Sequence, residues 1–137
     1  MSDFVLDKHI YVGATMSINK TIVEENVRDF AEMTGDFNPV HIDETAARNS
    51  RFGKRICHGM LVASYISTVL GMYLPGPGTI YLNQTMEFLL PTYIGDTITA
   101  SVTVTEIKRN IITLDTIVLN QEQEHVIDGK AVVMIEK

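Results

Sequence analysis

Residues 59–73 read GMLVASYISTVLGMY, and the predicted fold follows from this segment. It is the most apolar part of the chain, but it is too short to span a bilayer, which takes about 20 residues. Residues 74–78, LPGPG, close it, because proline and glycine interrupt a helix. Apolar side chains occur on nearly every face of the stretch, which predicts a buried helix surrounded by other elements. A curved sheet wrapped around this helix is the simplest structure that buries it.

The second half of the chain supplies strands for that sheet. Several segments are rich in Val, Ile and Thr and alternate in polarity as strands do: residues 80–88, 97–107, 111–119 and 125–135. Because the connections between them are short, we expect antiparallel pairing. Residues 11–19 are mixed and contain a glycine, and they predict an edge strand. The predicted fold class is α+β, with one long helix enclosed by an antiparallel sheet.

The segment that follows residue 20 changes to helical spacing. Thr21 and Glu24 fit a capping box, and Val27 and Ala31 continue the apolar face of the predicted helix. This helix should end near Gly35. Further along, Asp43 is expected to cap a short turn through residues 46 and 47.

The sequence TGDFNPVH, residues 34–41, places a carboxylate and an imidazole five residues apart. Pro39 fixes its own φ and biases Asn38 toward extended geometry, so Asp36 and His41 cannot share one continuous helix and should face each other across a bend. An imidazole and a carboxylate that share one small substrate or one water can carry out proton transfer. By spacing alone, a capping aspartate and a surface histidine are the more common interpretation of these residues.

Gly59 marks the predicted start of the buried helix. A glycine there leaves backbone N–H groups uncovered, and the helix dipole favours negative charge at this end. A developing oxyanion could therefore be stabilised at Gly59. The alternative is that this glycine only permits close packing or caps the helix.

Composition excludes several classes of protein. With 137 residues and no internal repeat, long linker or low-complexity segment, the chain is expected to form one domain, residues 1–137. Its formal net charge of −6 argues against nucleic-acid binding. The one cysteine excludes an internal disulfide, and His41, His58 and Cys57 lack the spacing of a zinc site, so no metal is expected. Residues 1–8 lack a signal-peptide pattern, which favours a cytoplasmic protein without a membrane partner.

Taken together, residues 30–41 and 58–60 resemble the MaoC-like hydratases, and within them the (R)-specific enoyl-CoA hydratases. The family's signature has an aromatic residue, then Thr/Ser-Gly-Asp-x-Asn-Pro-aliphatic-His, then a small residue. Here Phe30, the 34–41 segment and Ala46 or Ala47 fill these places. The resemblance extends through residues 74–76, 88–91 and 95–96. Cys57 departs from the pattern, where a small residue such as Ala is expected, and we interpret it as a buried, inert side chain.

The resemblance implies a hot-dog fold, a homodimer whose two sheets join, and an acyl-CoA substrate with no separate cofactor. The implied reaction is the reversible hydration of trans-2-enoyl-CoA to (R)-3-hydroxyacyl-CoA. Asp36 and His41 would hold the attacking water, and the N–H of Gly59 would stabilise the oxyanion. Sequence does not decide which of Asp36 and His41 is the base. Asn38 is a secondary candidate that more simply shapes the loop.

Substrate-binding residues are predicted along the buried helix and beside it. Ser67 and Leu70 resemble positions that limit acyl length in relatives, although ordinary core packing explains them equally well. Phosphates of coenzyme A require cations. One candidate is the local basic cluster of Arg51, Lys54 and Arg55, and another is the pair Lys108 and Arg109 on a predicted hairpin turn. His58 and His125 receive no catalytic role.

Two other functions remain open at this point. A hot-dog thioesterase could use the same carboxylate and oxyanion site to direct water at the carbonyl carbon, and it would release free thiol. A non-catalytic acyl-thioester-binding subunit would bind without turnover. The complete Asp36/His41 loop favours the hydratase, because a binding subunit has no physical need for a titratable pair there.

Overall fold

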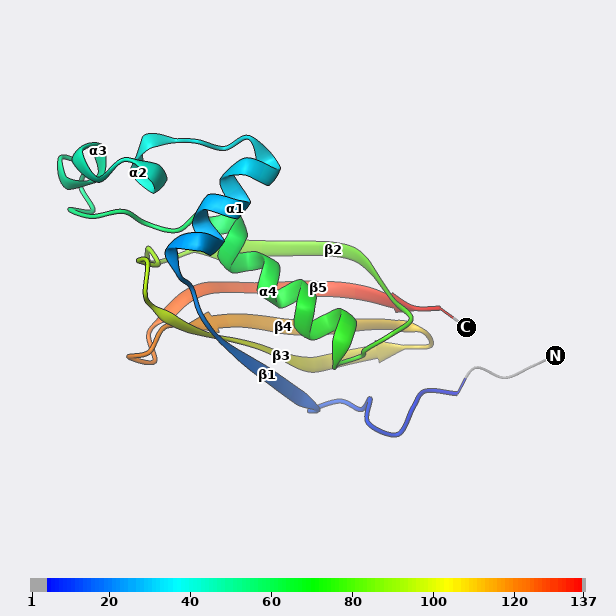
Figure 1. Cartoon of the computed structure of the whole chain (residues 1–137). Helices are drawn as coiled ribbons and strands as arrows, with labels where there is room; N and C mark the ends of the chain where they lie inside the picture. The colour runs from blue at the N-terminus through cyan, green and yellow to red at the C-terminus, as the bar shows by residue number, and fades with distance from the viewer. Residues whose placement is uncertain (1–4, 137) are drawn as a thin grey trace.

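A computed structural model describes residues 5–136 of the chain (Figure 1). Residues 1–4, on which part of the expectation about a signal peptide rests, and residue 137 lie outside the described residues. Within residues 5–136, five strands form one antiparallel sheet in the order β1-β3-β4-β5-β2. These strands are β1 (Thr15–Thr21), β2 (Thr79–Phe88), β3 (Thr97–Lys108), β4 (Ile111–Leu119) and β5 (His125–Ile135).

Helix α4 (Gly59–Met72) crosses one face of the sheet, so the predicted buried helix and antiparallel sheet are confirmed (Figure 1). Its inward side chains pack against those of β3 and β4, whose residues alternate between buried and partly exposed positions. Leu61, Val62, Ile66, Val69 and Leu70 of α4 belong to this core. Burial of these apolar side chains is the main stabilising contribution of the helix, at about 25 cal/mol per Å² of apolar surface.

One face of α4 nevertheless remains open. Met60, Ser64 and Ser67 are exposed, so the prediction of a helix enclosed on all sides is wrong for this face of the single chain. Among residues 5–136, no helix is both long and apolar enough to cross a membrane.

The edge strand β1 is confirmed, but its bounds differ from the prediction. It begins at Thr15 because Gly13, with φ of 97°, turns the chain before it, and it extends to Thr21. The hydroxyl of Thr21 lies 2.7 Å from that of Thr97 on β3. Thr21 therefore does not cap the next helix, and the predicted Thr21/Glu24 capping box is wrong.

Helix α1 (Glu24–Thr34) begins instead after Val23, whose backbone N–H donates to Oδ1 of Asn26 (2.9 Å). The helix ends as predicted, at Gly35, whose φ of 80° lies in the left-handed region that glycine adopts readily. Two short helices follow, α2 (Pro39–Ile42) and α3 (Glu44–Arg48). The cap by Asp43 is confirmed, since its carboxylate accepts from the N–H groups of residues 45 and 46. Figure 1 shows α1, α2 and α3 gathered at the end of the sheet where α4 begins.

Candidate active site

The loop between α1 and α2 carries Asp36, and α2 carries His41. Asn38 shapes this loop, as predicted: its backbone N–H donates to Oδ1 of Asp36 (3.2 Å), and its side-chain oxygen accepts from the N–H of Val40 (3.3 Å). Asn38 has φ −52° and ψ 125°, the extended geometry that a following proline favours. Pro39 is then the first residue of α2, where its missing N–H costs nothing. The predicted bend between Asp36 and His41 is confirmed.

His41 is buried, with 9% of its surface exposed. Its Nδ1 lies 2.8 Å from the carbonyl oxygen of Ile56. A carbonyl only accepts, so Nδ1 carries the hydrogen, and Nε2 of the neutral ring is left with a lone pair. Burial lowers the pKa of His41, a shift that the Ile56 hydrogen bond opposes. His41 is therefore set up to accept a hydrogen bond or a proton at Nε2.

His58 lies beside the two predicted catalytic residues and is 2% exposed. Its Nε2 donates to the backbone oxygen of Asp36 (3.0 Å), and its ring stacks on that of His41 with 4.0 Å between centroids. Phe30 packs against the His58 ring at 4.8 Å. These contacts agree with the structural part expected for His58, which links the Asp36 loop to α2.

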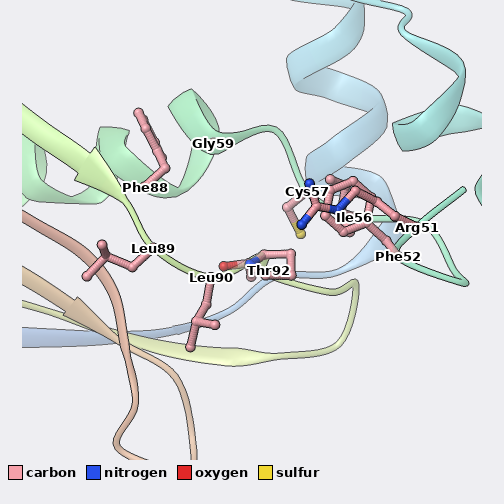
Figure 2. Close-up of a pocket in the computed structure, with 10 residues that line it drawn as sticks. Arg51, Phe52, Ile56, Cys57, Gly59, Phe88, Leu89, Leu90 and Thr92 are labelled. Carbon is pink, nitrogen blue, oxygen red and sulfur yellow. The ribbon is translucent and has the colours of Figure 1, made fainter.

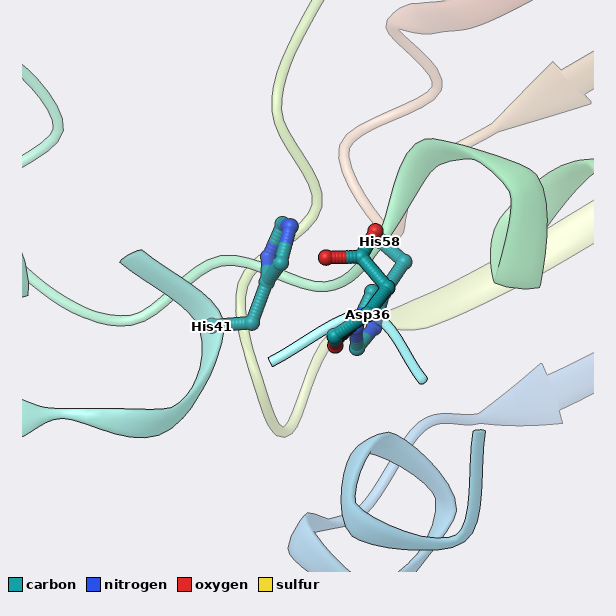
Figure 3. A group of neighbouring side chains, drawn as sticks. All are labelled: Asp36, His41 and His58. Carbon is teal, nitrogen blue, oxygen red and sulfur yellow. Dashed lines mark hydrogen bonds between the residues drawn. The ribbon is translucent and has the colours of Figure 1, made fainter. Parts of the chain in front are cut away.

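The side chains of Asp36, His41 and His58 form one cluster (Figure 3). One polar side-chain atom from each lies within 4.8 Å of the others, and Figure 3 shows the Asp36 carboxylate extending toward the His41 ring. Two hydrogen bonds of about 2.8 Å each can span a separation of up to this size, so the spacing is compatible with one water shared by Asp36 and His41.

The same cluster is a poor match to a metal site. A metal bound by an imidazole lies in the plane of the ring, about 2.0–2.1 Å from the nitrogen. The two rings are stacked 4.0 Å apart with planes only 29° from parallel, so they do not converge on one point at that distance. In addition, Nδ1 of His41 and Nε2 of His58 are already hydrogen-bonded to carbonyl oxygens. The donor set therefore suits a water better than a metal.

Gly59 is the first residue of α4, as predicted. The first hydrogen bond of the helix runs from the N–H of Val62 to the oxygen of His58 (3.2 Å), so the amides before it belong to the unsatisfied first turn. A Cβ at position 59 would lie 2.8 Å from the ring of Phe88. Both interpretations of this glycine thus have structural support, since it allows the close approach of Phe88 and presents an uncovered helix terminus.

A cavity of about 330 Å³ lies beside Gly59 (Figure 2). Its walls are mainly apolar and come from Phe52, Ile56, Phe88 and Leu90, with Arg51 at the same cavity. A second groove, of about 310 Å³, runs between the open face of α4 and β2. Ser67 lines this groove, whereas Leu70 is 1% exposed and packs in the core. The structure therefore separates the two positions that were expected to line one pocket.

The structure also gives different surroundings to the three members of the predicted basic cluster, residues 51, 54 and 55. Arg51 lies over the ring of Phe52, and Nζ of Lys54 lies 4.4 Å from the ring centroid of Tyr93. Arg55 is only 8% exposed and is held by carboxylates on α1 and α3. The expectation that Arg55 offers a free cation for phosphates is corrected, because its charge is already compensated within the fold. Lys108 and Arg109 lie on the β3–β4 turn, at the end of the sheet away from the start of α4 (Figure 1).

Cys57 is 3% exposed, and burial raises the pKa of its thiol to about 12. The interpretation of this residue as an inert, buried side chain is therefore supported. The carbonyl of Ile56 was not predicted as part of the site, and Arg55 was predicted with a different role, as a cation for phosphates. The position of Arg55 directly before the apolar Ile56-Cys57 pair was the available sequence signal that its side chain is buried. Nothing in the local sequence identified its partners on α1 and α3.

Comparison with known proteins identifies the family. The family model described as "MaoC like domain" matches residues 10–126. The chain is 45% identical to an (R)-specific enoyl-CoA hydratase of Rhodospirillum rubrum, and the match covers 90% of this chain and 86% of that protein. It is 42% identical to a 3-hydroxybutyryl-CoA dehydratase of Methylorubrum extorquens, and the match covers 92% of this chain and 81% of that protein. The solved (R)-hydratase from A. caviae, described as involved in PHA biosynthesis, is 39% identical with a TM-score of 0.90, covering 94% of this chain and 99% of that one. The chain belongs to the MaoC-like family.

Proposed function

We propose that this protein catalyses the reversible hydration of trans-2-enoyl-CoA to (R)-3-hydroxyacyl-CoA. The observation that carries the proposal is the convergence of Asp36 with a buried, neutral His41 within 4.8 Å, beside the N-terminus of α4. Support also comes from relatives named as (R)-specific enoyl-CoA hydratases that match 90% of the chain. The proposal treats residues 1–137 as one domain and places it in the cytoplasm, with the coenzyme A thioester as substrate and no further cofactor.

In the proposed mechanism, one water donates its two hydrogens to the Asp36 carboxylate and to Nε2 of His41. The remaining lone pairs of this water then point outward, toward the β-carbon of a bound enoyl thioester. As the new C–O bond forms, the pair accepts one proton from the water. The pair then returns this proton to the α-carbon from the same side, which restores the pair and completes the addition of one water. Asp36 and His41 act as a coupled pair, and the assignment of base and acid belongs to the pair.

Electron density from the attacked double bond moves onto the thioester oxygen during this step. In the proposal, the backbone N–H of Gly59 donates to that oxygen. The first-turn amides of α4 are not used by the helix, and the helix dipole adds positive potential at this end. One preorganised donor of this kind is worth about 10²–10³ in rate.

Substrate recognition is proposed to use the cavity beside Gly59 and the groove between α4 and β2. The groove that Ser67 lines would hold the acyl chain, and Leu70 would limit it indirectly, through the packing of α4. The cavity at Arg51 would hold part of the coenzyme A arm, and Arg51 and Lys54, both exposed, would face its phosphates. Asn38 is retained as the residue that shapes the catalytic loop.

We also propose that the protein forms a homodimer through β2. This strand pairs with β5 on one side and is the last strand of the sheet. It exposes large apolar side chains, among them Ile80 and Leu82, and an unprotected apolar edge favours pairing with another strand. A second copy pairing there would join the two sheets and cover the open face of α4. Size-exclusion chromatography with light scattering tests this: Leu82→Lys is expected to give monomers, and a wild-type monomer would contradict the proposal.

The function is tested by mixing the purified protein with crotonyl-CoA and following the loss of enoyl-thioester absorbance, with free thiol and product chirality measured in parallel. A hydratase removes the absorbance without releasing thiol and forms the (R) product, and Asp36→Asn loses nearly all of this rate. The matched control is Asp128→Asn, which alters a half-exposed aspartate whose carboxylate bonds to His125 on the same strand. Thiol release in step with the absorbance would identify a thioesterase, and binding without turnover would identify a binding subunit.

A further inference from the structure

Arg55 connects all three short elements that surround the active site. Its Nε donates to the backbone oxygen of His41 on α2 (2.6 Å). Its Nη2 lies 2.8 Å from Oε2 of Glu24 on α1, and its Nη1 lies 3.4 Å from Oε1 of Glu44 on α3. The side chain is 8% exposed. A buried guanidinium with contacts to three residues is a specific arrangement, because each of the three nitrogens of its planar fork faces an acceptor on a different helix.

We propose that Arg55 is a positioning residue for the hydration step, and that its Nε–H holds the backbone of His41 so that the imidazole Nε2 meets the attacking water. The inference rests on the proposed function. Arg55 touches neither water nor substrate in this proposal and acts only through His41.

The need for such a residue follows from the shortness of α2. Helix α2 spans only residues 39–42, and a helix of one turn does not hold its own orientation. The dipeptide Arg55-Ile56 holds it from outside. Ile56 donates its N–H to the oxygen of Val40 (3.3 Å) and accepts from Nδ1 of His41 (2.8 Å), while Arg55 binds the oxygen of His41. Both the ring and the backbone of His41 are therefore held by two adjacent residues.

The carboxylates of Glu24 and Glu44 in turn hold Arg55. They are half-exposed and exposed, whereas the guanidinium is buried, so they compensate its charge at the protein surface. Glu24 also pairs with Arg28 (2.7 Å), an exposed arginine on the same helix. Two separable functions result: the carboxylates stabilise the buried charge, and the Nε–H places His41.

The test compares variants that remove one function each. Arg55→Lys keeps the charge but loses the fork, and a single ammonium is expected to settle on the carboxylates and leave the His41 carbonyl without its donor. The double variant Glu24→Gln/Glu44→Gln keeps the Nε–H and loses the ion pairs. Arg28→Lys is the matched control on the same Glu24. Each is assayed with crotonyl-CoA at a temperature at which circular dichroism shows it to be folded.

If Arg55 positions His41, Arg55→Lys should lower kcat by at least about tenfold and leave KM within about twofold of the wild-type value. The reason is that displacement of a catalytic group by about 1 Å costs up to about 10² in rate. The acid limb of its pH–rate profile should also move to higher pH, since a loosened His41 gains solvent and burial no longer lowers its pKa as far. The titratable groups facing His41 are Asp36 and His58, and neither is altered in these variants. The double glutamine variant should melt at lower temperature but keep kcat and the acid limb.

The proposal is overturned if Arg55→Lys keeps the kcat and the acid limb of the wild type, or if kcat in every variant follows only the folded fraction. Should Arg55→Lys not fold, Arg55→Gln replaces it, with the same expected loss of kcat and the same shift of the acid limb. The pH titration of the His41 imidazole by NMR gives a readout that needs no turnover. A wild-type protein without hydratase activity would contradict the proposed function, whereas an unchanged His41 titration in the Arg55 variant would contradict this inference.

Discussion

The double variant Asp36→Asn/His41→Gln tests whether the two residues act on one water. Their polar atoms lie within 4.8 Å of each other, which one bridging water covers with two hydrogen bonds of about 2.8 Å. A positioned acid or base contributes about 10²–10⁴ in rate, or about 2.7–5.4 kcal/mol of barrier. Each single substitution should therefore lower kcat for crotonyl-CoA by about this factor.

Residues that act as one unit are not additive. The double variant should be within about tenfold of the slower single variant, whereas two independent groups would multiply to about 10⁴–10⁸. Asp36 is exposed, and an asparagine oxygen can still accept from the N–H of Asn38, so the fold should be unaffected. His41→Gln loses the Ile56 bond and the stack on His58, which should cost about 1–3 kcal/mol of stability.

The assay is steady-state hydration of crotonyl-CoA, with thermal unfolding of each variant to correct for the folded fraction. His125→Gln and Asp128→Asn, at the exposed histidine–aspartate pair of β5, serve as controls and should retain wild-type rates. Multiplicative losses in the double variant would refute the shared water, and near-wild-type activity in either single variant would refute the assignment of the pair.

Three further predictions concern His41, Cys57 and Gly59. Burial lowers the pKa of His41, so the folded state binds a proton there less readily than the unfolded state does. The free energy of unfolding and kcat/KM should therefore be retained above the ordinary pKa of about 6.5 and should fall as the pH decreases toward the lowered pKa. An acid limb of the pH–rate profile above about pH 7 would contradict this prediction. Because the thiol of Cys57 has a pKa of about 12 and is buried, iodoacetamide at about pH 8 should label the denatured protein only, as mass spectrometry would show. Gly59→Ala places a Cβ 2.8 Å from the Phe88 ring, where an ordinary contact is about 3.5–4.0 Å, and should lower kcat by about tenfold. The double variant Gly59→Ala/Phe88→Ala should recover part of the lost kcat. No recovery would argue against a clash between these two side chains.

Elements with local signals were predicted from sequence to within a few residues. The strands at 111–119 and 125–135 have the predicted bounds, because alternation of apolar and polar residues is visible without knowledge of the partner strand. The start of the helix at Gly59 and the end of α1 at Gly35 were likewise predictable. The capping box at Thr21 failed, since the same hydroxyl pairs across the sheet with Thr97, and a local motif does not reveal such a competing partner.

By itself, the sequence determined the sheet, the buried helix and the Asp36/His41 loop, because periodicity, glycine and proline act over a few neighbouring residues. Tertiary packing determines that Arg55 holds His41 instead of remaining a free cation, that His58 stacks on His41, and that Ser67 faces a groove while Leu70 packs in the core. These features depend on which distant residues come into contact and on how much water they exclude. Burial and partners of this kind arise only when the chain packs, so no local pattern contains them.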